Sequence, residues 1–103
     1  MKTFKDLIFT EHSISTIEKD AKQAVLEFDN GRGISVVTGA KFFRTSEASP
    51  YEVGFFKKDG SLGVVNILST TNVLLNENSD YNDVEGYCTE EDVNLIMKHI
   101  QNI

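Results

Sequence analysis

The apolar positions of residues 24–38 predict a β-hairpin. Ala24, Leu26 and Phe28 occupy every second position, as in a strand that buries one face. A second apolar stretch, Ile34–Thr38, follows shortly after. Between them lies Asn30-Gly31, two residues that tolerate the positive φ angles of a tight turn. This region is therefore predicted to form two antiparallel strands.

A helical pattern competes with the first of these strands. Apolar residues from Ile14 to Phe28 also fit one stripe of a helix, and Ser15 with Glu18 three residues later resembles a capping box. The turn that follows immediately favours a strand for the last part of this stretch. The sequence leaves undecided whether Ser13–Lys19 forms a short helical turn.

A second hairpin is predicted further along the chain. Tyr51–Phe56 and Leu62–Leu68 are apolar stretches that flank Asp59-Gly60, a common hairpin turn. The polar stretch Thr45–Pro50, which holds the only proline, is the expected loop between the two hairpins. Thr71–Leu75 is predicted to be a short strand or a segment that closes the sheet.

The C-terminal residues predict a long polar loop followed by a helix. Asn76–Gly86 is acidic and poor in apolar residues, which is typical of a loop. Thr89 is a favourable N-cap, and the three acidic residues after it suit the positive end of a helix dipole. One helical face then carries four apolar side chains, Val93, Ile96, Met97 and Ile100.

These elements predict a single domain over residues 1–103 of the α+β class. The expected architecture is a twisted antiparallel sheet of about four strands, in two hairpins, covered on one face by the C-terminal helix. The other face is covered either by the N-terminal segment Phe4–Phe9 or by a partner. Because Ile34–Thr38 carries no charge, it is expected either inside the sheet or at a homodimer interface.

Charge is distributed unevenly along the chain. From Met1 to Leu75 the acidic and basic residues are equal in number, so the net charge of −6 comes from Asn76–Ile103. An acidic end on a neutral body favours a cationic partner surface and disfavours direct binding to nucleic acid. The candidate partner-binding residues are the acidic residues of the polar loop and one arginine in the first hairpin turn: Glu77, Asp80, Asp83, Glu85 and Arg32.

Composition narrows the class of protein. A chain of 103 residues with 40% hydrophobic and 25% charged residues is typical of one globular domain. Its single cysteine, Cys88, excludes a disulfide framework and suits a reducing compartment. The apolar residues of Met1–Thr10 are interrupted by charges, unlike a signal peptide, and no apolar run is long enough to span a membrane. We therefore expect a cytoplasmic protein without membrane contact.

No residue pattern predicts catalysis or a cofactor. The residues capable of nucleophilic or acid–base chemistry are Cys88, His12 and His99. His99 lies about 15 Å along the helix axis from Cys88, too far for a catalytic pair, and a structural thiol is the expected role of the cysteine. The acidic loop also lacks the glycine and glutamate positions of a calcium loop. The expected activity is therefore non-enzymatic, with no metal or other cofactor.

Three stretches together resemble a set of small bacteriophage proteins of unknown function. They are Asp29–Val37, Tyr51–Phe56 and Asp83–Val93, which match a hairpin, a strand and an acidic loop that runs into a terminal helix. Arg32 stands where those proteins have an aromatic residue, and Gly54 where they have alanine. The resemblance implies a viral or prophage origin and an accessory role, and it transfers no catalytic or binding residue.

Two functional hypotheses follow. In the first, the chain is a phage-type accessory protein in the host cytoplasm whose acidic C-terminal surface binds and modulates or inhibits a host protein. A nucleic-acid-handling enzyme or a defence complex would be such a host target. The alternative is a module that binds or sequesters a small nucleotide-like ligand, whose charge would be met by Arg32, Arg44 or Lys57.

Overall fold

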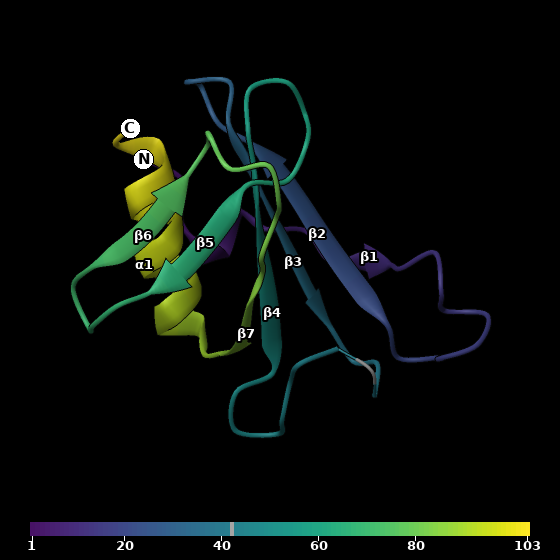
Figure 1. Ribbon diagram of the computed structural model, residues 1–103. Coiled ribbons are helices and arrows are strands. Elements are labelled where there is room, and N and C mark those ends of the chain that lie inside the picture. Colours follow the sequence, from purple (N-terminus) through teal and green to yellow (C-terminus); the bar gives the residue numbers. More distant parts are fainter. Residues whose placement is uncertain (42) are drawn as a thin grey trace.

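The computed structural model describes residues 1–41 and 43–103 (Figure 1). Seven strands and one α-helix follow a short 3₁₀ helix, η1, at the start of the chain. The strands are β1 (Thr10–Glu11), β2 (Lys22–Glu27), β3 (Gly33–Thr38), β4 (Tyr51–Phe56), β5 (Val64–Ile67), β6 (Val73–Asn76) and β7 (Glu85–Cys88). The helices are η1 (Phe4–Asp6) and α1 (Glu90–Gln101). The α+β class is confirmed, with more strands than the sequence predicted.

The strands form two antiparallel sheets. The main sheet has five strands in the order β1-β2-β3-β4-β7, and β5 pairs with β6 in a second sheet. The first predicted hairpin is confirmed as β2 and β3, with Leu26 opposite Ile34 and Gly31 in the turn at φ 85°. Because β3 lies between β2 and β4, its uncharged residues are inside the sheet, as one of the two expectations for this strand required.

The second predicted hairpin is only partly correct. Its turn forms, since Gly60 has φ 84° and the Lys57 amide donates to the Ser61 carbonyl at 2.8 Å. Pairing stops at a single bridge between Phe56 and Leu62, after which the chain leaves to form β5 in the second sheet. The edge of β4 is paired instead with β7, part of which was predicted to be loop.

The C-terminal helix agrees with its prediction. The Thr89 hydroxyl accepts from the Asp92 amide at 3.2 Å, and the Asp92 carboxylate accepts from the Thr89 amide at 2.9 Å. This reciprocal pair satisfies two amides at the start of α1. The four predicted apolar side chains are fully buried: Val93, Ile96, Met97 and Ile100.

One core joins the two sheets and the helix. Buried side chains of β3 and β4 belong to one cluster with those of α1, β5 and β6. Figure 1 shows α1, β5 and β6 on the same side of the main sheet. We call this side of the main sheet the inner face and the opposite side the outer face. Among the fully buried residues of the inner face are Ile34, Val36, Val53 and Phe55.

The N-terminal segment lies on the inner face, not on the outer face as one prediction had it. Phe4 and Phe9 pack against Tyr51 of β4, with ring centroids 5.2 and 5.9 Å from the Tyr51 ring, and η1 contacts α1. The reason is a set of polar contacts with the helix: the Gln101 side-chain amide bonds both the amide and the carbonyl of Lys2, at 2.8 and 2.7 Å.

The outer face is covered only in part. Leu62 and Val84 lie over Gly54, where their side chains would be 3.1 and 3.7 Å from an added Cβ. The Gln23 amide donates to the Ser35 hydroxyl at 3.0 Å. Val25 of β2 remains 60% exposed, so an apolar surface persists at one end of this face.

Candidate functional site

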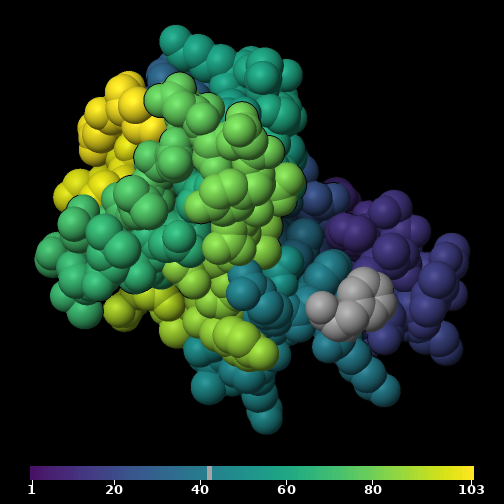
Figure 2. All heavy atoms as spheres, in the orientation of Figure 1, coloured from purple at the N-terminus to yellow at the C-terminus, as the bar shows by residue number. Residues whose placement is uncertain are grey.

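The chain between β6 and β7, residues 77–84, carries most of the predicted partner-binding residues. We call it the acidic loop. It passes over the outside of the molecule between the two sheets (Figure 1), and Figure 2 shows the surface around it in green to yellow-green. Different contacts hold the two ends of the loop in place, and the middle of the loop faces solvent.

The first end is held by an ion pair with the β2–β3 turn. Arg32 and Glu77 make two parallel contacts, Nε to Oε1 at 2.5 Å and Nη2 to Oε2 at 3.0 Å. The side chains are only 12% and 29% exposed, so the pair is partly shielded from water. Two parallel bonds between a guanidinium and a carboxylate fix orientation as well as distance. Two of the five predicted residues therefore bind each other.

The second end is held by Arg44, from the connection between β3 and β4. Its guanidinium donates to the Val84 carbonyl and lies 3.8 Å from the Asp83 carboxylate. Its own carbonyl accepts from the Tyr87 amide at 2.7 Å. The arginine also packs directly on Gly86, where an added Cβ would lie only 2.5 Å from the Arg44 Cβ. A single residue, through its side chain and its backbone carbonyl, thus connects the loop to β7.

Backbone contacts with the second sheet reinforce this end. The Asp83 amide donates to the Gly63 carbonyl at 3.3 Å, and the Asp83 carbonyl accepts from the Val65 amide at 3.2 Å. The Glu85 carboxylate accepts from the Ile67 amide at 2.5 Å. The Glu85 side chain is therefore occupied in joining β7 to β5.

The middle of the acidic loop faces solvent. Asp80, Tyr81 and Asn82 are all exposed, and the Tyr81 side chain is 68% exposed. Within residues 1–41 and 43–103, Asp80 makes no side-chain hydrogen bond or ion pair. Asp83 keeps about half of its surface exposed beside Arg44. Of the predicted residues, Asp80 and Asp83 are therefore those whose carboxylates remain accessible.

Two tyrosines that were not among the predicted partner-binding residues also belong to this surface. Tyr81 lies beside Asp80, and Tyr87 follows in β7 with 58% exposure and a φ of 54°. A positive φ is uncommon for a residue other than glycine. It occurs here where the pairing of β4 with β7 shifts register between Tyr51 and Val53. An aromatic residue within a polar, acidic stretch was the available signal in the sequence.

The three residues considered for catalysis, Cys88, His12 and His99, each contact a backbone group. Burial, together with the carboxylates of Asp92 and Glu85, raises the pKa of the Cys88 thiol to about 12. Cys88 lies just before α1, whose positive end favours a thiolate, but desolvation disfavours the thiolate more strongly. His99 bonds the Leu95 carbonyl at 3.0 Å, and His12 accepts from the Ile14 amide. A structural role for the cysteine agrees with this burial.

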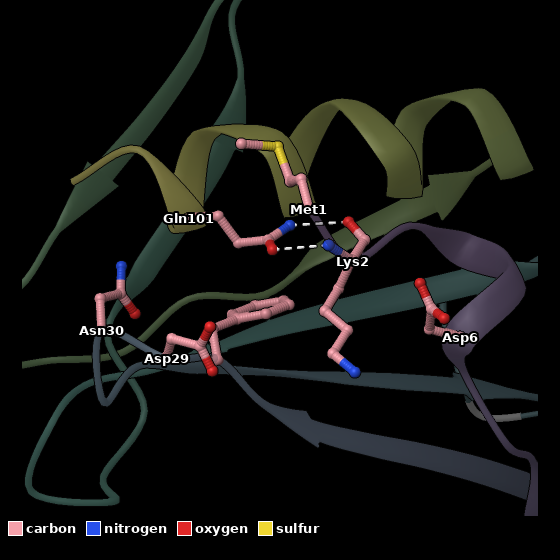
Figure 3. Close-up of a pocket in the computed structure, with 7 residues that line it drawn as sticks. Met1, Lys2, Asp6, Asp29, Asn30 and Gln101 are labelled. Atoms are coloured by element: carbon pink, nitrogen blue, oxygen red, sulfur yellow. Dashed lines mark hydrogen bonds between the residues drawn. The ribbon is translucent and has the colours of Figure 1, made fainter.

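A cavity of about 550 Å³ lies beside the N-terminal segment (Figure 3). Phe28 lines this cavity, and the Asp6 and Asp29 carboxylates and the Gln101 side chain, which binds the Lys2 backbone, lie around it. Its charges are mixed, and none of the predicted partner-binding residues lines it. The cavity is therefore separate from the acidic loop.

Three further observations describe the chain as a whole. Among the described residues, no group of three or more His, Cys, Asp or Glu side chains could hold a metal ion. No helix in this part of the chain has the length and apolar character that crossing a membrane requires. Comparisons with protein families, with curated proteins and with solved structures find no match to this chain.

The Arg32–Glu77 pair gives the unfolding free energy a predictable pH dependence. The hydrogen bond from Arg32 holds the pKa of Glu77 below its ordinary value of 4.5. A carboxyl whose pKa is lower in the folded state stabilises the fold above its unfolded pKa, and this contribution is lost as the pH falls through the folded pKa. We expect Glu77→Gln to be less stable than the wild type at neutral pH. The difference should shrink below about pH 4.5.

Urea unfolding of both proteins between neutral pH and about pH 3 measures this difference. Asp80→Asn is the matched control, because it also removes one carboxylate from the acidic loop but breaks no ion pair. If Glu77→Gln lowers the unfolding free energy by the same amount at every pH, protonation of Glu77 in the Arg32–Glu77 pair is not linked to folding.

Proposed function

We propose that this chain is a non-enzymatic accessory protein of the bacteriophage type. It binds a basic surface of a host protein in the host cytoplasm and modulates or inhibits that protein. The observation that carries the proposal is the acidic loop, whose ends are anchored by Arg32 and Arg44 while Asp80 and Tyr81 face solvent. A loop that is already held in place loses little conformational entropy on binding.

The chemistry of the loop suits a protein partner with a positive surface. Tyrosine is among the residues enriched at protein interfaces, where it supplies a large and rigid contact. Carboxylates around it steer a cationic partner and set the salt dependence of binding. Enzymes and complexes that handle nucleic acid present basic surfaces to phosphate groups, so they are the class of partner that we favour.

We assign the predicted residues to two roles. Asp80 and Asp83 have accessible carboxylates and are proposed to contact the partner, with Tyr81 added to them. Glu77, Glu85 and Arg32 hold the loop in position through their internal contacts. Changes at Asp80 and Tyr81 should weaken binding without loss of stability. Changes at Asp83, which also lies 3.8 Å from the Arg44 guanidinium, and at the second group should alter stability as well.

Charge reversal of the loop tests this proposal. We expect the double variant Asp80→Lys, Asp83→Lys to bind its partner about tenfold more weakly or worse at low salt, since unlike charges become like charges. The control is Asp20→Lys, Glu47→Lys, which makes the same change in net charge at two exposed positions outside the loop. Tyr81→Ala removes the aromatic contact and should also weaken binding.

The measurement has two stages. Immobilised wild type, loop variant and control are first exposed to bacterial extracts, and proteins retained by wild type and control but lost by the variant are identified at increasing salt. The affinity of each purified candidate is then measured for all three proteins. A partner that binds the loop variant as tightly as the wild type, or a complex insensitive to salt, would contradict the proposed surface.

A further inference from the structure

A hollow of about 230 Å³ lies on the outer face of the main sheet, and Arg32, which binds Glu77 at the first end of the acidic loop, is among its lining residues. It is located where the β2–β3 turn and the β4–β5 turn come together. We call it the lysine hollow, after the two lysines on one wall. Its lining residues are Val25–Glu27, Gly31–Gly33, Phe56–Lys58 and Gly60.

The floor of the lysine hollow is apolar and partly exposed. Gly33 is buried there, and an added Cβ would lie 2.9 Å from the Leu26 carbonyl oxygen and 3.6 Å from the Phe56 Cβ, so only glycine fits beside the half-buried Phe56. Val25, 60% exposed, lines the same space from β2. Exposed apolar surface that is enclosed on several sides favours a ligand that can remove it from water.

One wall carries unpaired positive charge. In residues 1–41 and 43–103, neither Lys57 nor Lys58 has a carboxylate within 4.0 Å, whereas Arg32 is bound to Glu77. The stem of Lys58 passes over the turn, with its Cγ 3.5 Å from the position of an added Cβ on Gly31. Both lysines also lower the pKa of Glu77, so their field extends over this end of the sheet. In a chain of net charge −6, this is a local site for an anion.

We propose that the lysine hollow binds a small apolar carboxylate. The apolar part, a single ring or a branched chain, covers Gly33 and Phe56, and the carboxylate is directed to Lys57 and Lys58. The volume is below the 300 to 1,000 Å³ that is roughly typical of drug-sized ligands, which favours one ring over a nucleotide. This inference does not rest on the partner proposed for the acidic loop.

Glu27 allows a second test of whether charge governs the binding of a carboxylate in the lysine hollow. Its carboxylate lines the hollow, where it opposes a bound anion. It is exposed, and in the described part of the chain it has no hydrogen-bond or ion-pair partner for its side chain. Glu27→Gln should therefore tighten the binding of a carboxylate. A variant that gains affinity cannot be explained by loss of folding.

The experiment is a titration of the full chain with 3-phenylpropionate, followed by the amide resonances in two-dimensional NMR. We expect the shifts to cluster at Val25, Gly33 and Phe56. The neutral amide of the same acid should bind more weakly, because it keeps the ring and loses the charge. Phenyl phosphate distinguishes the two anion classes, and tighter binding of the phosphate would overturn the assignment to carboxylates.

The variants locate the site. Lys57→Gln, Lys58→Gln should weaken 3-phenylpropionate about fivefold or more, the range expected for two partly exposed charge contacts. Lys5→Gln, Lys19→Gln removes the same charge from exposed positions elsewhere and should leave the affinity unchanged. The proposal is overturned by absence of binding at millimolar probe, by equal binding of the amide, or by shifts centred outside the hollow.

Discussion

Gly39→Ala is expected to destabilise the protein by on the order of 3 kcal/mol or more. Gly39 directly follows β3 and has a φ of 89°, and a Cβ at this position would lie 1.8 Å from the carbonyl oxygen of Asp20. The variant therefore suffers both a strained backbone conformation and a backbone clash that no side-chain rotation can relieve. Urea unfolding followed by circular dichroism measures the loss.

Gly60→Ala is the matched control for this variant. Gly60 has nearly the same φ, 84°, but nothing lies within 4 Å of an added Cβ. It should therefore cost only the backbone strain, about 1 kcal/mol. Equal losses for Gly39→Ala and Gly60→Ala would show that the close approach of the Asp20 backbone has no energetic consequence.

Val36→Lys is expected to unfold the protein or to remove most of its stability. Val36 is fully buried on the inner face of β3, and an unpaired ammonium group there costs several kcal/mol of a total that is about 5–15 kcal/mol for a domain. The matched control is Val25→Lys, in the neighbouring strand but on the outer face and 60% exposed. That change should alter stability by no more than about 0.5 kcal/mol.

Circular dichroism and light scattering distinguish the outcomes for these two lysine variants. An unfolded Val36→Lys beside a folded Val25→Lys confirms that β3 is a buried central strand. A folded, monomeric Val36→Lys obtained from a dimeric wild type would instead place β3 at an interface between two copies of the chain, the other arrangement that its lack of charge suggested.

The candidate site could be predicted only in part. The charge distribution indicated the acidic loop, because counting charges along the chain requires no structure. It did not indicate which carboxylates are accessible. Glu77 is occupied by Arg32, 45 positions away in sequence, and Glu85 by a backbone amide of β5. Such contacts depend on how the two sheets meet, and no local pattern of residues encodes them.

The lysine hollow and the exposed tyrosines illustrate the same limit. The sequence predicted the turn at Asp59-Gly60 and a strand that includes Val25, and both form. Their proximity requires the register that pairs Gly33 with Phe56 and brings the two turns together. The exposure of Tyr87 requires the irregular pairing of β7 with β4.

The sequence by itself determined the elements whose signals are local. Alternation of apolar residues and Asn30-Gly31 determined the β2–β3 hairpin, and Thr89 with the apolar stripe after it determined α1, since caps and turns act over a few residues. Only the tertiary structure decided that the chain after Asp59-Gly60 leaves the main sheet and that β7 takes its place. Glu85–Cys88 has little apolar alternation, so this strand forms because β4 offers unpaired backbone groups that must be satisfied.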